Sequence, residues 1–452
     1  MIDTDRHHDP RLAKRRQRVD RFVRPVQSFI ALETAGGVVL LLASVLALAW
    51  ANSPWSDAYH DLLEYHLAID LGFWSLDESL HFWINDAAMV LFFFVVGLEI
   101  KRETVVGELS NLRRVIVPIV AAFGGMLAPA LIFVTLTLGS DGSGGWGIPL
   151  ATDIAFAIGV LTVVGKRVPF GLRVMLLALA IVDDIGGIIV IAVFYTSDLA
   201  LEPLFFAAAV VGLIFVLRQS GIWYLPIYIV LGFVAWAATV DSGIHPTIMG
   251  VILGLLAPWK AWYREEDFAD LAESEVERYR EAAGSQDEEY AHEQKTHALR
   301  QLNHLTDRAI PPLDRLEHEL QPLVAFAIVP IFAFANAGVS LSPDTVGGAL
   351  TAPVALGVFF GLFIGKPLGI FVATWLVVKA GAQLPAGVGW PGVIGMGALG
   401  GIGFTVSLLI TQLSFTDATL LTDAKLAIIA ASLLSGIVGF VTLKMVYPAG
   451  RS

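Results

Sequence analysis

The chain has 452 residues and a formal net charge of −12, and 56% of its residues are hydrophobic whereas only 15% are charged. Soluble domains carry about 25% charged residues, so this composition excludes an ordinary soluble protein and indicates a membrane protein. The acidic balance argues against a nucleic-acid partner. The sequence has no cysteine, which excludes disulfides, thiolate metal sites and thiol chemistry.

About twelve apolar segments are long enough, at about twenty residues each, to cross a hydrocarbon core about 30 Å thick. They are residues 28–52, 81–100, 114–138, 146–165, 171–196, 203–217, 222–240, 244–259, 320–341, 351–380, 387–413 and 423–447. We therefore predict an all-α polytopic membrane protein. Its parts are a basic N-terminus (1–27), eight helices (28–259), an acidic loop insertion (260–319), four helices (320–447) and a short tail (448–452).

Basic residues gather on one set of connections between these segments. They are Lys14, Arg15, Arg16, Arg18, Arg21, Arg24, Lys101, Arg102, Arg113, Arg114, Lys166, Arg167 and Arg173. Short loops rich in Lys and Arg stay in the cytoplasm, which predicts that both termini are cytoplasmic; Lys425 is an exception. The basic start also fits a signal peptide, but the apolar run exceeds the usual 7 to 15 residues, so a first span is favoured.

The outer connection, residues 51–80, mixes acidic residues with aromatic ones. The alternation in residues 66–74 fits a β-hairpin lying at the membrane surface. It equally fits a loop anchored by interfacial aromatic side chains.

The second segment carries Asp86 near its outer end, where hydration explains the charge. Its cytoplasmic end carries Glu99, Arg102 and Glu103. This cluster fits a solvated helix end, or a vestibule that attracts cations or responds to pH.

Two segments carry signs of a helix break. In the fourth, Pro149 removes a backbone donor just before Thr152 and Asp153. The eleventh has five glycines in residues 395–403. Each glycine costs a helix interior up to about 1 kcal/mol relative to alanine. Paired interrupted segments in matching positions, fourth and eleventh of twelve, point to a transport site.

The fifth segment contains Asp183 and Asp184 side by side among apolar residues. One ionised aspartate at a helix centre in lipid costs about 2.5 to 3.5 kcal/mol, so this pair implies a function or a partner. Lys366 lies about midway along the tenth segment. It is expected to pair with a buried aspartate, or else to reach the membrane surface or a wet cavity by itself.

Residues 260–319 contain sixteen Asp or Glu against eight Lys or Arg. Local helix is expected in residues 265–283, but no packed core. The segment is interpreted as a solvated insertion, with a regulatory or partner-binding role as the alternative.

With Asp183-Asp184, Thr152-Asp153, Lys366-Pro367 and the Gly-Gly-Ile-Gly-Phe-Thr run at 400–405 in place, the sequence resembles the NhaA-type sodium/proton antiporters. Further matching stretches are 83–86, 96–103, 150–156 and 332–338, so the resemblance covers about residues 25–446. NhaA is itself a known example of a transporter with inverted repeats and broken helices, so the general rule about such breaks and the family resemblance are not independent.

The resemblance implies twelve helices, with an inverted repeat whose two discontinuous helices cross at midmembrane. It implies that Asp184 is the central cation and proton carboxylate, that Asp183 pairs with Lys366, and that Thr152 and Asp153 shape the site and offset helix-end charges. It also implies a homodimer held by a hairpin in 51–80, and a pH-response cluster of Glu99, Arg102 and Glu103.

Three stretches depart from the family pattern. His245 stands where the family has a histidine, and it is a further residue assigned to pH response. In this sequence Pro246 follows it and is expected to alter the start of the helix. Gln321-Pro-Leu replaces a common His-Pro-Trp. The acidic insertion replaces a short loop with further pH-linked residues, which are therefore not mapped onto this sequence.

The expected function is a secondary antiporter of the inner membrane that exchanges intracellular Na⁺ or Li⁺ for external H⁺ by alternating access. It is expected to serve pH and sodium homeostasis and to move more than one proton per cation. Asp184, Asp183 and Thr152 would hold the cation transiently, beside Asp153. No cofactor and no enzyme activity are expected, since no metal-ligand spacing or nucleophile elbow stands out. The alternatives are a proton-coupled small-solute transporter and a cation channel.

Overall fold

A computed structural model describes residues 33–448 apart from 71, 73, 108–111, 166, 197–198, 223 and 286. The predicted basic N-terminus 1–27 and residues 449–452 of the tail lie outside the described residues. The described chain is mostly helical and forms two compact units. Unit 1 comprises residues up to Tyr65, Ile116–Asp183 and residues from Ala325, whereas unit 2 comprises His66–Val115 and Asp184–Val324.

Unit 1 contains both segments that were predicted to be interrupted. Its elements are α2 (Glu33–Ala51), α3 (Ser56–Glu64), most of α6 (Leu112–Thr137), η3 (Asp141–Leu150), α7 (Ile154–Val164), the first part of α8 (Phe170–Phe194), most of η4 (Val324–Ile328), α15 (Val329–Ala337), α16 (Pro343–Ala349), α17 (Pro353–Phe360), η5 (Gly361–Gly365), α18 (Lys366–Lys379), α19 (Trp390–Gly400), α20 (Phe404–Ser414) and α21 (Ala418–Val446).

Unit 2 contains the hairpin, the second part of α8 and the acidic segment. Its other elements are β1 (His66–Asp70), β2 (Ser75–Ser79), α4 (Leu80–Phe82), η1 (Trp83–Ala88), α5 (Met89–Val105), α9 (Leu201–Gln219), α10 (Leu225–Val240), α11 (Thr247–Leu256), α12 (Glu265–Ala283), α13 (Glu288–Ala309) and α14 (Pro312–Leu323).

Seven helical stretches of the described chain are long and apolar enough to cross a membrane, and up to ten if each bent helix pair is one span. Two of the twelve predicted segments correspond to the shorter apolar helices α10 and α11. The ten residues of α11 extend about 15 Å, half of a hydrocarbon core. The count of twelve spans therefore stays a prediction.

The breaks expected from Pro149 and from the glycine cluster are confirmed. Helix η3 bends by 44° into α7 across residues 151–153, and α19 bends by the same 44° into α20 across residues 401–403. A third bend, of 114° between α2 and α3, was not predicted. It turns the chain within the outer connection, where α3 forms a short helix.

The outer connection contains a hairpin, the first of the two interpretations of residues 66–74. Strand β1 pairs antiparallel with β2, with His66 opposite Ser79 and Asp70 opposite Ser75. The pairing therefore extends beyond the predicted stretch, because Ser75–Ser79 supplies the second strand.

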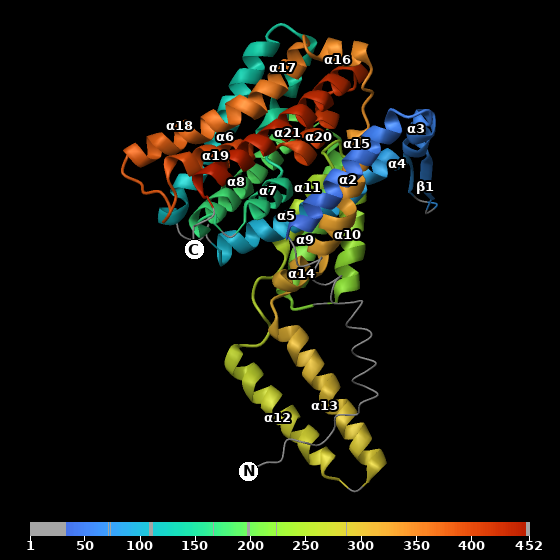
Figure 1. The fold of residues 1–452 in the computed structure, drawn as a ribbon. Coiled ribbons are helices and arrows are strands. Elements are labelled where there is room, and N and C mark those ends of the chain that lie inside the picture. The colour runs from blue at the N-terminus through green and yellow to red at the C-terminus, as the bar shows by residue number, and fades with distance from the viewer. Residues whose placement is uncertain are drawn as a thin grey trace. The chain divides into compact units, whose positions relative to one another are not determined.

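The acidic segment forms a helical pair, in which α12 and α13 lie side by side (Figure 1). The predicted helix at 265–283 is confirmed as α12, but α13 was missed. The expectation that this segment has no packed core is wrong, because Ala282, Ala291, Ala298 and Leu305 are buried. Small alanine side chains let two charged helices approach closely while their acidic faces stay in solvent.

The next helix also begins earlier than predicted. Helix α14 starts at Pro312, eight residues before the predicted start of the ninth segment at 320. A proline in the first turn of a helix loses no hydrogen bond and already has a helical φ, so Pro312 favours this start.

The last helix begins at Ala418 rather than at 423, because Asp417 caps it. Its Oδ1 accepts hydrogen bonds from the Leu420 amide at 3.0 Å and the Thr419 amide at 2.8 Å. These bonds lower the pKa of the Asp417 carboxyl, since they favour its ionised form.

Helices α5 and α11 of unit 2 pack closely because α11 carries glycine at the contact. A Cβ at Gly250 would lie 2.2 Å from the Val90 carbonyl oxygen, so Gly250→Ala must push the helices apart. We expect a loss of about 1 to 3 kcal/mol, seen as a lower Tm in detergent. The control Gly212→Ala in α9 meets nothing within 4 Å and should leave the Tm unchanged or raise it. Equal Tm values for the two variants would contradict the close contact.

Candidate functional site

The two breaks of unit 1 face each other. The Asp153 amide donates to the Ile402 carbonyl at 2.6 Å, and the Thr152 hydroxyl lies 2.9 Å from the Gly400 carbonyl. Backbone groups freed by a helix break inside a membrane must be buried in protein or line a cavity. Each break therefore supplies partners for the other.

Asp153 joins the two broken helices. It is the N-cap of α7, where its Oδ1 accepts from the Phe156 amide at 3.0 Å. Its Oδ2 accepts from both the amide (3.1 Å) and the hydroxyl (2.7 Å) of Thr405, in the first turn of α20. Two helix N-termini thus meet one carboxyl group. In the sequence, Thr405 stands out only as the last residue of the Gly-Gly-Ile-Gly-Phe-Thr run. Nothing in the sequence indicates that it contacts Asp153.

Asp183 lies in contact with Lys366 and Thr152. Lys366 Nζ is 2.9 Å from Asp183 Oδ2, and neither side chain is exposed. Lys366 also donates to the carbonyl of Leu150, the last residue of η3. The Thr152 hydroxyl is 2.7 Å from the same Asp183 oxygen. A hydroxyl has one hydrogen, so Thr152 donates to either Asp183 or Gly400 at any moment.

One oxygen of this cluster has no hydrogen-bond partner among the described residues. Asp183 Oδ1 is buried and has no hydrogen-bond partner within the described part of the chain. A buried carboxylate oxygen costs free energy unless a donor or a cation meets it. The site therefore has capacity for one more positive group.

Asp184 follows Asp183 on α8, about 100° further around the helix axis. It is 7% exposed. The boundary between the two compact units falls between these two aspartates. The adjacent carboxylates therefore belong to different units of the fold.

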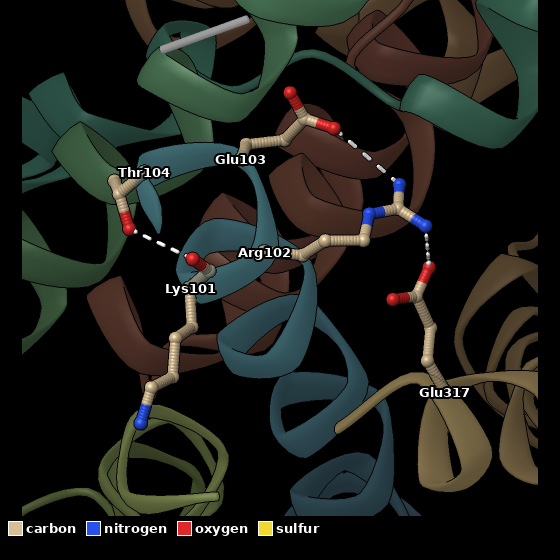
Figure 2. Close-up of polar contacts among 5 residues, drawn as sticks. All are labelled: Lys101, Arg102, Glu103, Thr104 and Glu317. Atoms are coloured by element: carbon tan, nitrogen blue, oxygen red, sulfur yellow. Dashed lines mark hydrogen bonds and ion pairs between the residues drawn. The ribbon is translucent and has the colours of Figure 1, made fainter. Parts of the chain in front are cut away.

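The cluster at the end of α5 has a partner that the sequence did not indicate (Figure 2). Arg102 Nη1 is 2.5 Å from Glu317 Oε1 on α14, and Arg102 Nη2 is 3.4 Å from Glu103 Oε1. Glu99 lies one turn before Glu103 and interacts electrostatically with all three side chains. Lys101 points away and donates to the Leu255 carbonyl at 2.6 Å.

Glu317 was assigned to the solvated acidic segment, although it lies on α14. A helical signal was present there, because Leu313, Leu316 and Leu320 follow Pro312 at helical spacing. Nothing in the sequence indicated that this helix packs against α5.

His245 does not join the Arg102 cluster. It precedes α11, whereas Lys101 contacts the Ala257 carbonyl just beyond the other end of that helix. Its Nε2 is 3.2 Å from Asp86 Oδ1, and its Nδ1 is 2.6 Å from the Thr247 hydroxyl. Hydration is therefore not the only explanation for the charge of Asp86 in an apolar segment, because His245 contacts its carboxyl group. Pro246 is the N-cap of α11, so the helix starts directly after the proline.

No group of three or more His, Cys, Asp or Glu side chains that could hold a metal ion occurs among the described residues. The oxygens at the breaks instead form a small set of carboxylate and hydroxyl groups beside a fixed lysine. Such hard oxygen ligands suit small hard cations.

Residues 27–443 match the model of the family described as Na⁺/H⁺ antiporter 1. A curated Na⁺/H⁺ antiporter NhaA 2 of Sorangium cellulosum is 46% identical, over 95% of this chain and 92% of its own length. The one of Syntrophotalea carbinolica is 44% identical, over 93% of this chain and 96% of its own length.

The solved structure of the sodium proton antiporter MjNhaP1 from Methanocaldococcus jannaschii has a similar fold. Its TM-score is 0.52 at 14% sequence identity, and the alignment covers 94% of this chain and 98% of that chain. Since the family model and relatives above 40% identity extend over nearly the whole sequence, this chain belongs to the Na⁺/H⁺ antiporter 1 family, which is a family of transporters and not of enzymes.

Proposed function

We propose that this multi-pass membrane protein exchanges intracellular Na⁺ or Li⁺ for external H⁺ by alternating access. The observation that carries the proposal is the buried contact between Lys366 and Asp183 beside two helix breaks that face each other. Charged groups inside a membrane protein mark ion pathways and proton relays.

The proposed chemistry is competition for one set of oxygens. Asp184 is the central carboxylate, which binds either a proton or the cation, and Asp183, Thr152 and Asp153 complete the oxygen ligands. Lys366 holds the Asp183 carboxylate and the end of η3 in place. A cation binds only when the carboxylate has lost its proton. If the site then opens alternately to the two sides, binding competition becomes exchange. No cofactor takes part, because the ions are the substrates.

In the proposed architecture twelve helices cross the inner membrane with both termini in the cytoplasm, and η3–α7 and α19–α20 are equivalent members of an inverted repeat. The equal bends of these two helix pairs support this equivalence. The segment 260–319 remains a cytoplasmic insertion in this scheme, between the helices of 28–259 and those of 320–447.

The cluster of Glu99, Arg102 and Glu103, with Glu317, is proposed to respond to cytoplasmic pH. Arg102 on α5 forms an ion pair with Glu317 on α14, and protonation of a carboxylate in this cluster would remove an ion pair and so alter the α5–α14 contact. His245 is proposed to respond separately, through Asp86.

A homodimer through residues 51–80 is also proposed. Among the described residues the sheet has two strands, so β1 and β2 each have an edge that no further described strand pairs, and such edges pair readily with another strand.

The test uses inside-out vesicles that respiration has made acidic inside, with a dye that reports ΔpH. Adding Na⁺ or Li⁺ should restore the dye signal at pH 6.5 to 9, and K⁺ should not.

A cation channel would instead pass ions without proton coupling. A small-solute carrier would respond to a solute and not to Na⁺. The cavity of unit 2, about 990 Å³, is lined mostly by aromatic and aliphatic side chains from several helices, with charged side chains such as Arg218, Lys260 and Arg308 among them.

Exchange of more than one proton per cation moves net charge, so the membrane potential then drives the cycle. In vesicles with a clamped potential, the rate should rise when the potential favours net charge movement. An exchange rate that does not change with the membrane potential would contradict the transport of more than one proton per cation. It would not contradict the antiport itself.

A further inference from the structure

A pair of amide side chains, Asn336 and the half-buried Gln412, links α15 to α20 at a distance from the proposed cation site. Gln412 Nε2 donates to Asn336 Oδ1 at 3.0 Å, and Asn336 is fully buried. Asn336 Nδ2 donates to the Phe332 carbonyl at 2.9 Å. A carbonyl only accepts hydrogen bonds, so the amide nitrogen of Asn336 must face Phe332 and its oxygen must face Gln412. The orientation of the pair is therefore fixed.

The α15 side of this pair is anchored by the corner between α2 and α3. The buried Tyr59 hydroxyl is 2.7 Å from the Phe334 carbonyl, one of the last carbonyls of α15, which lack helical partners. Asn52 donates to the Val339 carbonyl at 2.8 Å and accepts from the Leu341 amide at 2.6 Å. The C-terminal end of α15 is thus held by directional bonds from another part of unit 1.

On the other side of the pair, helix α20 connects Gln412 to the residues of the proposed cation site. Gln412 and Thr405 are seven residues apart on α20, which places them on the same face of the helix, about 10 Å apart along its axis. Thr405 gives Asp153 two hydrogen bonds. Because a helix of two to three turns moves as a rigid piece, a shift of α20 at Gln412 moves Thr405 as well.

We propose that Asn336 and Gln412 are positioning residues for cation binding: the Asn336–Gln412 hydrogen bond sets the position of α20 and hence of the Thr405 donors that hold Asp153. Hydrogen bonds are directional, whereas leucine packing tolerates sliding, so the amide pair fixes α20 along its axis better than its apolar neighbours Leu408 and Leu409 do. This inference rests on the proposed function, because Asp153 is assigned to the cation site there.

The experiment measures the Na⁺ concentration for half-maximal exchange and the maximal rate, in inside-out vesicles with the full chain. Gln412→Leu keeps the size of the side chain and removes the donor, and Asn336→Ala removes the acceptor. Each should raise the half-saturating Na⁺ concentration about three- to tenfold, the range expected for one lost hydrogen bond. The double variant should be no worse than the more affected single variant, because the two residues form one contact.

The matched control is Thr411→Val. Thr411 is the neighbour of Gln412 and is fully buried, and its hydroxyl donates to the Ser407 carbonyl of the same helix at 2.8 Å. Its loss should lower the Tm as much as Gln412→Leu does, but should leave the half-saturating Na⁺ concentration unchanged.

The outcomes separate this inference from the proposed function. Wild-type half-saturation in Gln412→Leu, an equal shift in Thr411→Val, or additive shifts in the double variant would each overturn the positioning role. If Asn336→Ala does not accumulate, Gln412→Leu and Thr411→Val decide the question. Absence of Na⁺-dependent exchange in the wild-type protein would instead refute the proposed function.

Discussion

Replacing Asp184 with asparagine is expected to abolish Na⁺/H⁺ exchange and to leave the fold intact. Asparagine has nearly the same size and shape as aspartate, so the packing of this nearly buried position should survive. It has no negative charge and does not release a proton between pH 6.5 and 9, so it cannot alternate between a proton and a cation. Removing a group that carries the proton should reduce the rate by roughly 100-fold or more.

The loss is measured with the dye assay in inside-out vesicles, beside membrane content, elution in size-exclusion chromatography and Tm. The matched control is Asp344→Asn, the same change in the exposed first turn of α16, which should exchange normally. A well-folded Asp184→Asn protein that exchanges at the wild-type rate would remove Asp184 from the centre of the mechanism.

Replacing Lys366 with alanine is expected to destabilise the protein strongly. Lys366 meets Asp183 at 2.9 Å, and both are fully buried. Without it, the Asp183 carboxylate keeps the Thr152 hydroxyl but has no cation beside it, and its Oδ1 already has no hydrogen-bond partner in the described chain. Removing one partner of a buried ion pair typically costs about 3 to 5 kcal/mol.

The measurement is the Tm in detergent, compared with two further variants. Lys379→Ala, at the exposed end of the same helix α18, should change the Tm little. The double variant Asp183→Asn, Lys366→Met should recover most of the lost stability, because neither buried charge remains. An unchanged Tm in Lys366→Ala would mean that the ion pair contributes nothing to stability.

Local features of the sequence were enough to predict the helix breaks. Pro149 and the glycines of 395–403 weaken helix hydrogen bonding at their own positions, so the bends appear where these residues lie. The same holds for α12, whose helical pattern is complete within its own residues. By contrast, α13 and the early start of α14 were missed because an acidic composition was taken to exclude packed structure.

The partners of the charged residues were harder to predict, because they come from distant parts of the chain. Arg102 and Glu317 are separated by 215 residues, and Asp153 and Thr405 by 252. Which side chains meet depends on how helices pack, and a single sequence contains no measure of that packing. The pairing of Asp86 with His245 was missed for the same reason.

The sequence by itself determined that the chain is a membrane protein with charged residues inside apolar segments and with two interrupted helices. Composition indicates burial in lipid, and proline and glycine indicate a helix break at their own positions. The motifs also identified the antiporter family. Only the tertiary structure decided that Asp183 meets Lys366 and Thr152, that Thr405 holds Asp153, and that Asn336 bonds Gln412. These contacts arise when helices far apart in sequence pack together, and their geometry is fixed by the whole fold of each unit.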